Sequence, residues 1–153
     1  MKSPAVLVAT GTKERLMSIP GEERNIGRGI SYCAVCDGAF YRDKEIAVIG
    51  AGNSALEEAV YLTQFANKVY IIMRRNVFRA DKIAVDAATS NPKIEIIQQA
   101  VPIEVLDDTT QVNRSKNIGC DYKRRTHPQH LRYFPLYRRR TCNGLFKTSQ
   151  RIR

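Results

Sequence analysis

Long apolar segments are absent from this sequence of 153 residues. No run of about 18 or more apolar residues occurs, so the sequence offers no candidate for a transmembrane helix. The first residues, Met1 to Pro4, do not lead into the apolar stretch and small-residue cleavage site of a secretory signal. The sequence therefore predicts a soluble, cytoplasmic protein, and its length predicts one ordinary domain with its own core.

Acidic residues are nearly absent from the last third of the chain. Residues 109–153 hold 12 Lys or Arg and one acid, Asp121, whereas residues 1–108 hold 13 basic and 14 acidic residues. The net charge of +10 therefore comes from one segment and does not mark the whole protein as a binder of polyanions. Neither a helical nor a strand period is visible after Thr109, so we expect a basic, disordered tail there.

Cysteines are few, and only one pair is close in sequence. Cys33 and Cys36 are separated by two residues, whereas Cys120 and Cys142 stand alone. A secreted domain held by disulfides would be shorter and richer in cysteine, so the pair favours redox chemistry. A zinc half-site is the alternative, but tetrahedral zinc needs a second close pair of ligands, and the sequence offers only a loose His-x-x-His in the basic tail. We therefore expect no metal.

A strand, a glycine turn, a helix and a second strand follow one another in the middle of the chain. Residues 45–49 form an apolar run that stops at Gly50, and residues 68–73 form another. Between them, small and apolar residues recur with the spacing of one helix face, at Ala55, Ala59, Leu62 and Ala66. This order predicts a βαβ crossover of about thirty residues. The fold class is therefore α/β, with an incomplete Rossmann-like domain.

The glycine turn and the arginines that follow it point to the coenzyme. In Gly50-Ala51-Gly52-Asn53-Ser54-Ala55, the glycines allow a tight turn and a close approach to a pyrophosphate, which the helix N-terminus then faces. About twenty residues further on, an NAD site would carry an acid, but Arg74, Arg75 and Arg79 stand here. Guanidinium groups suit a 2′-phosphate, so NADPH is favoured over NADH. An ordinary turn beside solvated arginines is the alternative.

Weaker patterns complete the expected elements. The run from Ala5 to Ala9 predicts a strand that ends at Thr10-Gly11, and residues 81–89 predict a short helix. Residues 94–97 and 101–106 predict two more strands, and Pro102 restricts the second of these to an edge or its first residues.

Several segments occur in the order and spacing of one enzyme family. They are Thr10-Gly11, residues 33–38, residues 50–59, Arg74-Arg75 and residues 78–80. In these segments, about two-thirds of the chain resembles the low-molecular-weight thioredoxin reductases, the class II pyridine nucleotide-disulfide oxidoreductases. The resemblance implies NADPH-dependent, FAD-mediated reduction of the thioredoxin disulfide through a CxxC dithiol. It also implies thioredoxin as the partner and a homodimer as the assembly.

The resemblance assigns roles to individual residues. It implies that Cys36 is the flavin-side cysteine, that Cys33 attacks the thioredoxin disulfide, and that Asp37 is the general acid. The residues implied at the NADPH pyrophosphate are Gly50, Gly52, Asn53, Ser54 and Ala55, and those implied at the 2′-phosphate are Arg74, Arg75 and Arg79. Thr10 and Gly11 match the turn that crosses over from the FAD domain, near the flavin.

Parts of the family pattern are missing. The family builds its FAD site from a segment with a second glycine-rich turn and another that ends in Gly-Asp, and neither occurs here. We therefore divide the chain into residues 1–12, a remnant of the FAD-domain crossover strand, residues 13–108, an NADPH-binding domain with CxxC, and residues 109–153, a basic tail of non-family character. A truncated or frameshifted gene product is our hypothesis for this pattern. Translation of the nucleotide sequence in all frames tests it, because a frameshift requires a family-like continuation in another frame.

Three alternative functions remain open at this point. The chain is an inactive NADPH-binding module if it binds the coenzyme without flavin. Arginines with interleaved aromatic residues in the tail, such as Tyr122, Tyr133, Phe134 and Tyr137, suit nucleic acid, although we expect no such partner. The flavoprotein subunit of alkyl hydroperoxide reductase uses the same domains but adds a thioredoxin-like part, which this sequence does not show.

Overall fold

The computed structural model describes residues 4–7, 9, 15–107, 118–124, 138–142 and 144–147. Thr10 and Gly11, which were predicted to lie near the flavin, are outside the described residues. The same holds for both histidines and for three of the four aromatic residues singled out in the tail. The predictions that concern these positions remain predictions.

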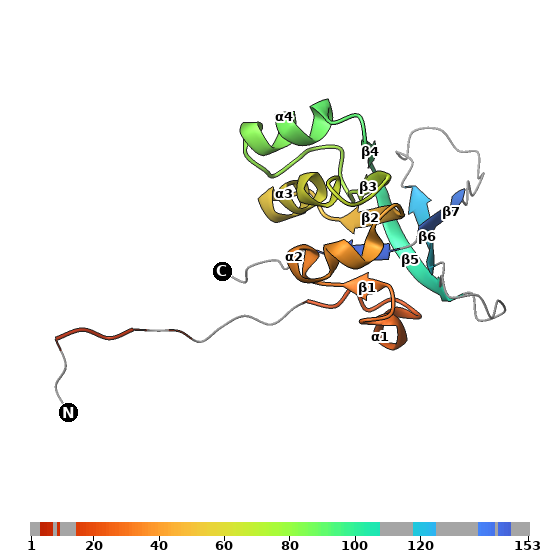
Figure 1. Cartoon of the computed structure of the whole chain (residues 1–153), viewed down its shortest axis with the longest axis horizontal. Helices are drawn as coiled ribbons and strands as arrows, with labels where there is room; N and C mark the ends of the chain where they lie inside the picture. The colour runs from red at the N-terminus through yellow and green to blue at the C-terminus, as the bar shows by residue number, and fades with distance from the viewer. Residues whose placement is uncertain are drawn as a thin grey trace, which may run out of the picture.

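Three layers make up the body of the molecule (Figure 1). The middle layer is a parallel sheet with the strand order β1-β8-β2-β3-β4. Its strands are β1 Ile30–Ser31, β2 Glu45–Ile49, β3 Lys68–Ile72, β4 Ile94–Ile97 and β8 Gly144–Lys147. On one side lies an antiparallel sheet of β5 Ala100–Asp107, β6 Ile118–Arg124 and β7 Arg138–Cys142.

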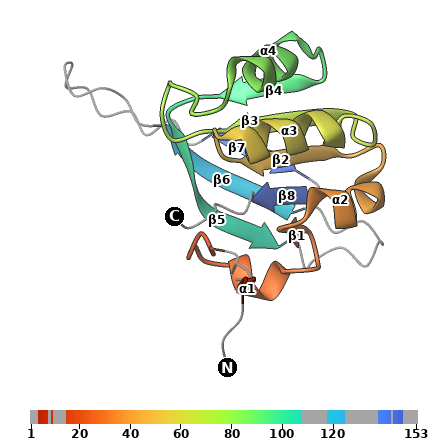
Figure 2. The ribbon, with the colours of Figure 1, turned by 90° about the vertical axis from the view of Figure 1, so that its left-hand side faces the viewer.

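Helices form the third layer, on the opposite side of the parallel sheet (Figure 2). The two longer ones are α3 Asn53–Leu62 and α4 Lys82–Ser90. The short α2 Ala34–Asp37, followed by the 3₁₀ helix η1 Gly38–Tyr41, contacts α3. The short α1 Glu22–Asn25 lies apart from these helices and contacts β5. None of the helices in the described ranges has the length and apolar character needed to cross a bilayer.

The predicted βαβ unit is confirmed by β2, α3 and β3. The two strands pair in parallel, with Ile46 opposite Val69 and Val48 opposite Ile71. Both faces of this sheet are covered, which explains why its strands read as continuous apolar runs. The predicted α/β class with a Rossmann-like arrangement is therefore correct.

The core divides between the two faces of the parallel sheet because side chains alternate along each strand. Ile46 and Val48 point to the helices, where they pack with the buried face of α3, whereas Ala47 points to the other side. The helix-side cluster includes the four residues of the predicted periodic face, Ala55, Ala59, Leu62 and Ala66, all fully buried. Helical spacing in the sequence thus identified the packing surface of α3.

Strands in the basic segment were not predicted. The expectation of disorder after Thr109 is wrong for β6, β7 and β8, and β8 lies between β1 and β2 in the parallel sheet. Strand pairing depends on backbone hydrogen bonds to a neighbour more than on intrinsic preference, so a segment without clear alternation can still pair. The predicted strand 101–106 is confirmed as β5, at the edge of its sheet and with irregular register between Pro102 and Glu104.

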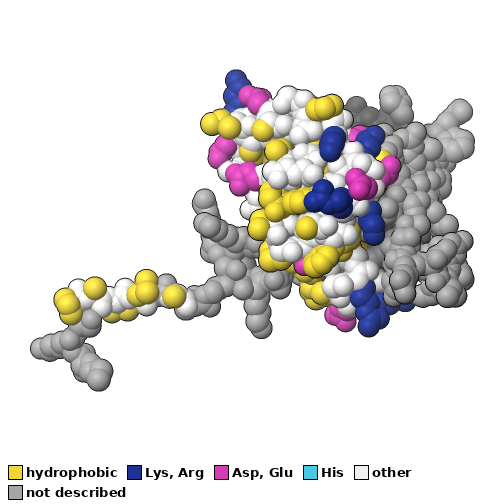
Figure 3. Space-filling view, viewed as in Figure 1, with side chains coloured by type: hydrophobic (Ala, Val, Ile, Leu, Met, Phe, Trp, Pro, Cys, Tyr) yellow, Lys and Arg dark blue, Asp and Glu magenta, His cyan; other side chains and the backbone are white. Residues whose placement is uncertain are grey.

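The strand predicted from Ala5 to Ala9 is not observed in its described residues. Residues 4–7 and 9 carry no strand, and Val6 and Leu7 are 81% and 91% exposed. Their apolar side chains lie along a segment that extends away from the body (Figure 3). An apolar run becomes a buried strand only where a neighbouring strand pairs with it, and this segment is in neither sheet.

Candidate nucleotide cleft and redox disulfide

The predicted cysteine pair forms a disulfide at the start of α2. Cys33 and Cys36 are bonded, with their Cα atoms 5.3 Å apart. The backbone N–H of Cys36 donates a hydrogen bond to Sγ of Cys33, 3.2 Å away, because Cys33 is the N-cap residue of this single-turn helix. Cys36 is exposed and Cys33 is half-buried. Reagents in solution can therefore reach the disulfide from the Cys36 side.

Asp37 follows the disulfide and is tied to the sheet by a residue that sequence reasoning missed. The hydroxyl of Ser31 in β1 donates to Oδ2 of Asp37 over 2.6 Å and accepts the N–H of Cys33 over 3.1 Å. Burial raises the pKa of the nearby Tyr41, and the charge of Asp37 raises it further. The sequence alone shows Ser31 as a small polar residue within an apolar stretch, and no motif indicates its contact with Asp37.

A close contact connects the redox motif with α3. Gly38, which begins η1, is buried, and a Cβ atom there would lie 2.9 Å from Cδ2 of Leu62 in α3. A larger residue at position 38 would therefore require the buried Leu62 side chain, or the backbone around it, to shift. Around the disulfide, Val35 and Phe40 are large apolar residues that are 69% and 77% exposed. Apolar side chains gather on this face of the molecule (Figure 3).

The glycine turn has the conformation that was predicted from its sequence. Gly50 has a φ of 151°, which side chains other than glycine rarely adopt, and its N–H donates to the Ile72 carbonyl at 3.0 Å. A Cβ on Gly52 would meet no atom within 4 Å, so the N-terminus of α3 faces open space. Ala55 is fully buried and allows the helix to pack closely on the sheet.

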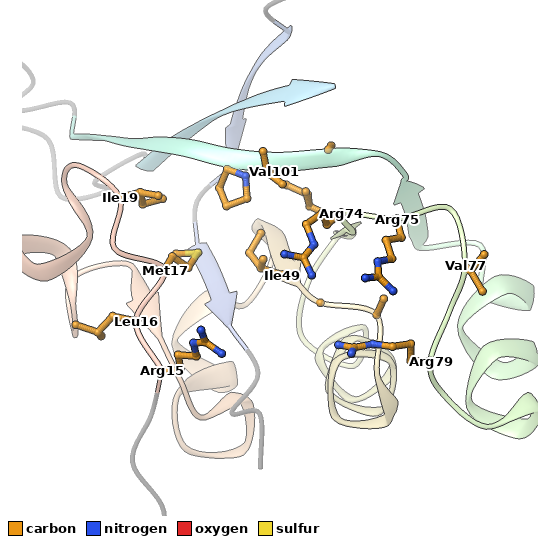
Figure 4. Close-up of a pocket in the computed structure, with 15 residues that line it drawn as sticks. Arg15, Leu16, Met17, Ile19, Ile49, Arg74, Arg75, Val77, Arg79 and Val101 are labelled. Atoms are coloured by element: carbon orange, nitrogen blue, oxygen red, sulfur yellow. The ribbon is translucent and has the colours of Figure 1, made fainter. Parts of the chain in front are cut away.

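The three predicted arginines lie around one cleft at the carboxyl ends of β2 and β3. Arg74, Arg75 and Arg79 line this cleft of about 580 Å³ together with Gly50 (Figure 4). Ligands of open α/β sheets bind at this end of the strands. Gly52, Asn53, Ser54 and Ala55 belong to the adjoining turn and helix but do not line the cleft, and neither do Cys33, Cys36 and Asp37.

Sequence reasoning missed the opposite wall of the cleft. It is formed by Arg15, Leu16, Met17 and Ile19 from the segment before α1 (Figure 4). Val101 and Pro102 of β5 also line the cleft. These residues come from distant parts of the chain and follow no local motif. Only the folded topology brings them opposite the arginines.

A buried carboxylate holds that wall in place. Glu22, 1% exposed, accepts the backbone N–H groups of Met17 at 2.7 Å and Ser18 at 2.6 Å, and the hydroxyl of Tyr32 at 2.5 Å. Burial would raise the pKa of Glu22, but the hydrogen bonds from Tyr32, Met17 and Ser18 outweigh it and lower the pKa. Because Tyr32 precedes Cys33, this carboxylate connects the cleft wall to the redox motif.

A reciprocal pair of hydrogen bonds joins the arginine loop to the glycine turn. The Asn53 amide donates to Oδ2 of Asp81 over 2.5 Å, and the Asp81 N–H donates to Oδ1 of Asn53 over 2.8 Å. The Arg79 N–H also donates to the Ala51 carbonyl at 2.8 Å. Asn53 was predicted to lie at the pyrophosphate. In this structure its side chain forms hydrogen bonds that hold the loop carrying Arg79 against the glycine turn.

The fold and the site define a class of protein, a Rossmann-like α/β domain with a CxxC disulfide. Residues 1–124 match the family described as pyridine nucleotide-disulphide oxidoreductase, and the chain belongs to this family. Within it, the chain is similar to thioredoxin reductases. It is 44% identical to that of Listeria monocytogenes over 118 residues, which are 77% of this chain and 37% of the relative. The bifunctional thioredoxin reductase/thioredoxin of Mycobacterium leprae is 49% identical over 106 residues, 69% of this chain and 23% of the relative.

Solved structures agree with these relatives. The thioredoxin reductase of Lactococcus lactis in its FR conformation superposes with a TM-score of 0.79 at 39% identity, over 92% of this chain and 43% of that one. The enzyme of Streptococcus pyogenes gives 0.76 at 37% identity, over 92% and 42%. The chain thus spans little more than a third of the length of the Listeria relative and less than a quarter of that of the Mycobacterium relative.

Proposed function

We propose that this chain supplies the NADPH-binding and dithiol part of a thioredoxin reductase. In this function NADPH reduces the Cys33–Cys36 disulfide by way of FAD, and the dithiol then reduces the disulfide of thioredoxin. The observation that carries the proposal is the presence, in one small domain, of an arginine-lined cleft and a partly exposed disulfide. A cytoplasmic location and a homodimer belong to the same proposal, because the resemblance implies both.

The residues around the cleft fit the chemistry of NADPH. The turn at Gly50 brings backbone close to the open N-terminus of α3, where a pyrophosphate is favoured. Arg74, Arg75 and Arg79 would hold the 2′-phosphate, since the described residues that line the cleft beside them include no acid. When bound, NADPH would supply the hydride and FAD would carry its two electrons to the disulfide. FAD enters the proposal through the family resemblance, which places Thr10 and Gly11 near it.

The dithiol can exchange with a protein disulfide through its own residues. The Cys33 thiolate attacks one sulfur of the thioredoxin disulfide, and the other thioredoxin sulfur leaves with the electron pair. Cys36 then attacks Cys33, which restores the internal disulfide and releases reduced thioredoxin. Asp37 would protonate the leaving sulfur. Exposed Val35 and Phe40 would form an apolar docking rim around this exchange.

Flavin spectroscopy tests the complete proposal. The purified chain is incubated with FAD, separated from free flavin, and titrated with NADPH without oxygen. Bound flavin that is bleached by NADPH, followed by reduction of added thioredoxin, is the expected outcome. A bound flavin that NADPH cannot bleach would contradict the proposed electron path.

An inactive NADPH-binding module is the second candidate. It is favoured by the arginine-lined cleft, whose lining residues all belong to this chain. Tight binding of NADPH with no retention of FAD would select this candidate. Calorimetric titration with NADPH and NADH, in the absence of flavin, measures this binding separately from turnover.

A further inference from the structure

Ser31 occupies an unusual position between the redox motif and the parallel sheet. It is 3% exposed, at the end of the two-residue strand β1. Its hydroxyl lies 2.6 Å from Oδ2 of Asp37 and 3.2 Å from the Cys33 carbonyl. A hydroxyl has one proton to donate, and the shorter distance to the stronger acceptor assigns it to Asp37. The hydroxyl oxygen also accepts the N–H of Cys33 at 3.1 Å.

This arrangement controls where the Asp37 carboxyl group lies. Asp37 is at the end of a helix of one turn, and its side chain is only half-buried. Within the described residues the ion pair observed joins Lys68 and Glu95, so no salt bridge is seen at Asp37. The hydrogen bond from Ser31 is thus the side-chain contact that fixes this carboxyl group relative to the cysteines.

We propose that Ser31 is a positioning residue that holds Asp37 for proton transfer when the Cys33–Cys36 disulfide opens. This inference rests on the proposed function, in which Asp37 is the acid of the redox pair. It adds a residue to which neither the sequence nor the family resemblance assigned a role.

An external dithiol reduces the Cys33–Cys36 disulfide in two successive exchange steps. A thiolate of the reagent attacks Sγ of the exposed Cys36, a new disulfide forms there, and the Cys33–Cys36 bond breaks. The electron pair remains on Sγ of Cys33, which the Cys36 N–H stabilises. That sulfur takes the proton that the Asp37 carboxylate has accepted from the attacking thiol of the reagent, and the Ser31 hydroxyl stabilises the carboxylate once this proton has left. The second thiol of the reagent then releases Cys36 and becomes oxidised. Protonation of Cys33 matters because a free thiolate would attack Cys36 and close the disulfide again.

The test measures how fast dithiothreitol opens the disulfide in the whole chain. Samples are quenched with acid at different times, alkylated, and analysed by peptide mass spectrometry, which separates Cys33 and Cys36 from the other two cysteines. Rates are compared between pH 5 and 9 for the wild type, Ser31→Ala, Ser31→Thr, Asp37→Asn and the double variant Ser31→Ala with Asp37→Asn. Ser90→Ala, an exposed serine on α4, is the matched control.

A positioning role has a signature that a structural role lacks. We expect Ser31→Ala and Asp37→Asn each to slow opening by roughly tenfold and to change the pH profile in the same way. Ser31→Thr keeps the hydroxyl and should retain the wild-type profile. In the double variant the loss should equal that of Asp37→Asn alone, because Ser31 acts through Asp37.

Two results would overturn the proposal. One is an unchanged rate in Ser31→Ala, and the other is a full additional loss from that substitution in the Asp37→Asn background. If Ser31→Ala does not fold, as judged by its circular dichroism, Ser31→Gly repeats the comparison. The assay needs neither NADPH nor FAD, so its failure leaves the proposed function standing, and failure of the flavin experiment leaves this result unaffected.

Discussion

The nucleotide cleft and the redox motif differ in how firmly the fold supports them. The cleft lies at the ends of β2 and β3, two fully paired strands with buried apolar residues on both faces. The redox disulfide lies between a strand of two residues and a helix of one turn. A binding site gains affinity from rigid walls, because less entropy is lost when the ligand binds. A dithiol that must open, exchange and close again needs access and local freedom.

Two connections between the regions, seen among the described residues, involve a buried group. Glu22 connects the cleft wall at Met17 and Ser18 with Tyr32, next to Cys33. On the other side of the motif, Gly38 allows close contact with α3. The difference between the regions suggests that substitutions in one should leave the chemistry of the other nearly intact.

Cys36→Ser is expected to have the largest effect on one region while leaving the other unchanged. This substitution removes one half of the disulfide, so reversible opening by dithiothreitol should be lost completely. The dissociation constant for NADPH should stay within about twofold of the wild-type value, because neither cysteine lines the cleft. Peptide mapping measures the first effect and calorimetric titration the second. A large loss of NADPH affinity would mean that the two regions are coupled more strongly than the contacts indicate.

The double variant Arg75→Ala with Arg79→Ala is expected to impair the cleft and to leave the disulfide unchanged. Loss of two guanidinium groups should weaken NADPH binding by about 2–3 kcal/mol, and NADH binding by much less, because only NADPH carries the 2′-phosphate. Disulfide opening should keep its wild-type rate. Arg42→Ala removes a positive charge that does not line the cleft and controls for net charge. Equal losses for the two coenzymes would refute the assignment of these arginines.

The two regions also differ in how much the sequence alone could predict. The βαβ unit, the buried face of α3 and the arginine cluster follow from local patterns, because hydrophobic period and motif spacing are set by nearby residues. The disulfide was predicted for the same reason. Ser31, Glu22 and the cleft wall at Arg15 could not be predicted, because their roles depend on contacts that only the folded chain creates. The strand β8 was missed because its partners, β1 and β2, are remote in sequence.

Helix α3 begins at the glycine turn beside the cleft and contacts α2 of the redox motif. Glu58 on this helix allows the effect of burial on the folding stability to be tested. Burial, and then the charge of Glu57, raise the pKa of Glu58 from 4.5 to about 7, and its Oε2 atom has no hydrogen-bond partner among the described residues. The folded state therefore binds this proton more tightly than the unfolded chain does. Stability is lost as the pH rises from 4.5 through about 7.

Glu58→Gln removes this titration. The variant should be more stable than the wild type by about 1–2 kcal/mol at pH 8, and the difference should disappear near pH 4.5. Urea unfolding at the two pH values measures it, with Glu23→Gln at an exposed site on α1 as the control. A difference that does not depend on pH would contradict the raised pKa.

The smallest expected effect on NADPH affinity comes from the hydrogen bonds between Asp81 and Asn53. Asp81→Ala removes both side-chain oxygens that can hold Asn53, so the loop that carries Arg79 should become less ordered. We expect a loss of about 1 kcal/mol in NADPH affinity, a smaller loss for NADH, and no change in disulfide opening. Asp86→Ala, on the exposed side of α4, is the control.

The charge of Asp81 acts in the opposite direction, which makes the sign of the result decisive. Removal of a negative charge near three arginines should strengthen the binding of an anion if electrostatics dominate. Asp81→Asn removes the charge but keeps an oxygen that can accept the Asn53 amide hydrogen bond. Weaker binding in Asp81→Ala with unchanged or tighter binding in Asp81→Asn shows that the hydrogen bonds position the arginines. Tighter binding in both variants shows that the rigidity of the cleft does not depend on this pair.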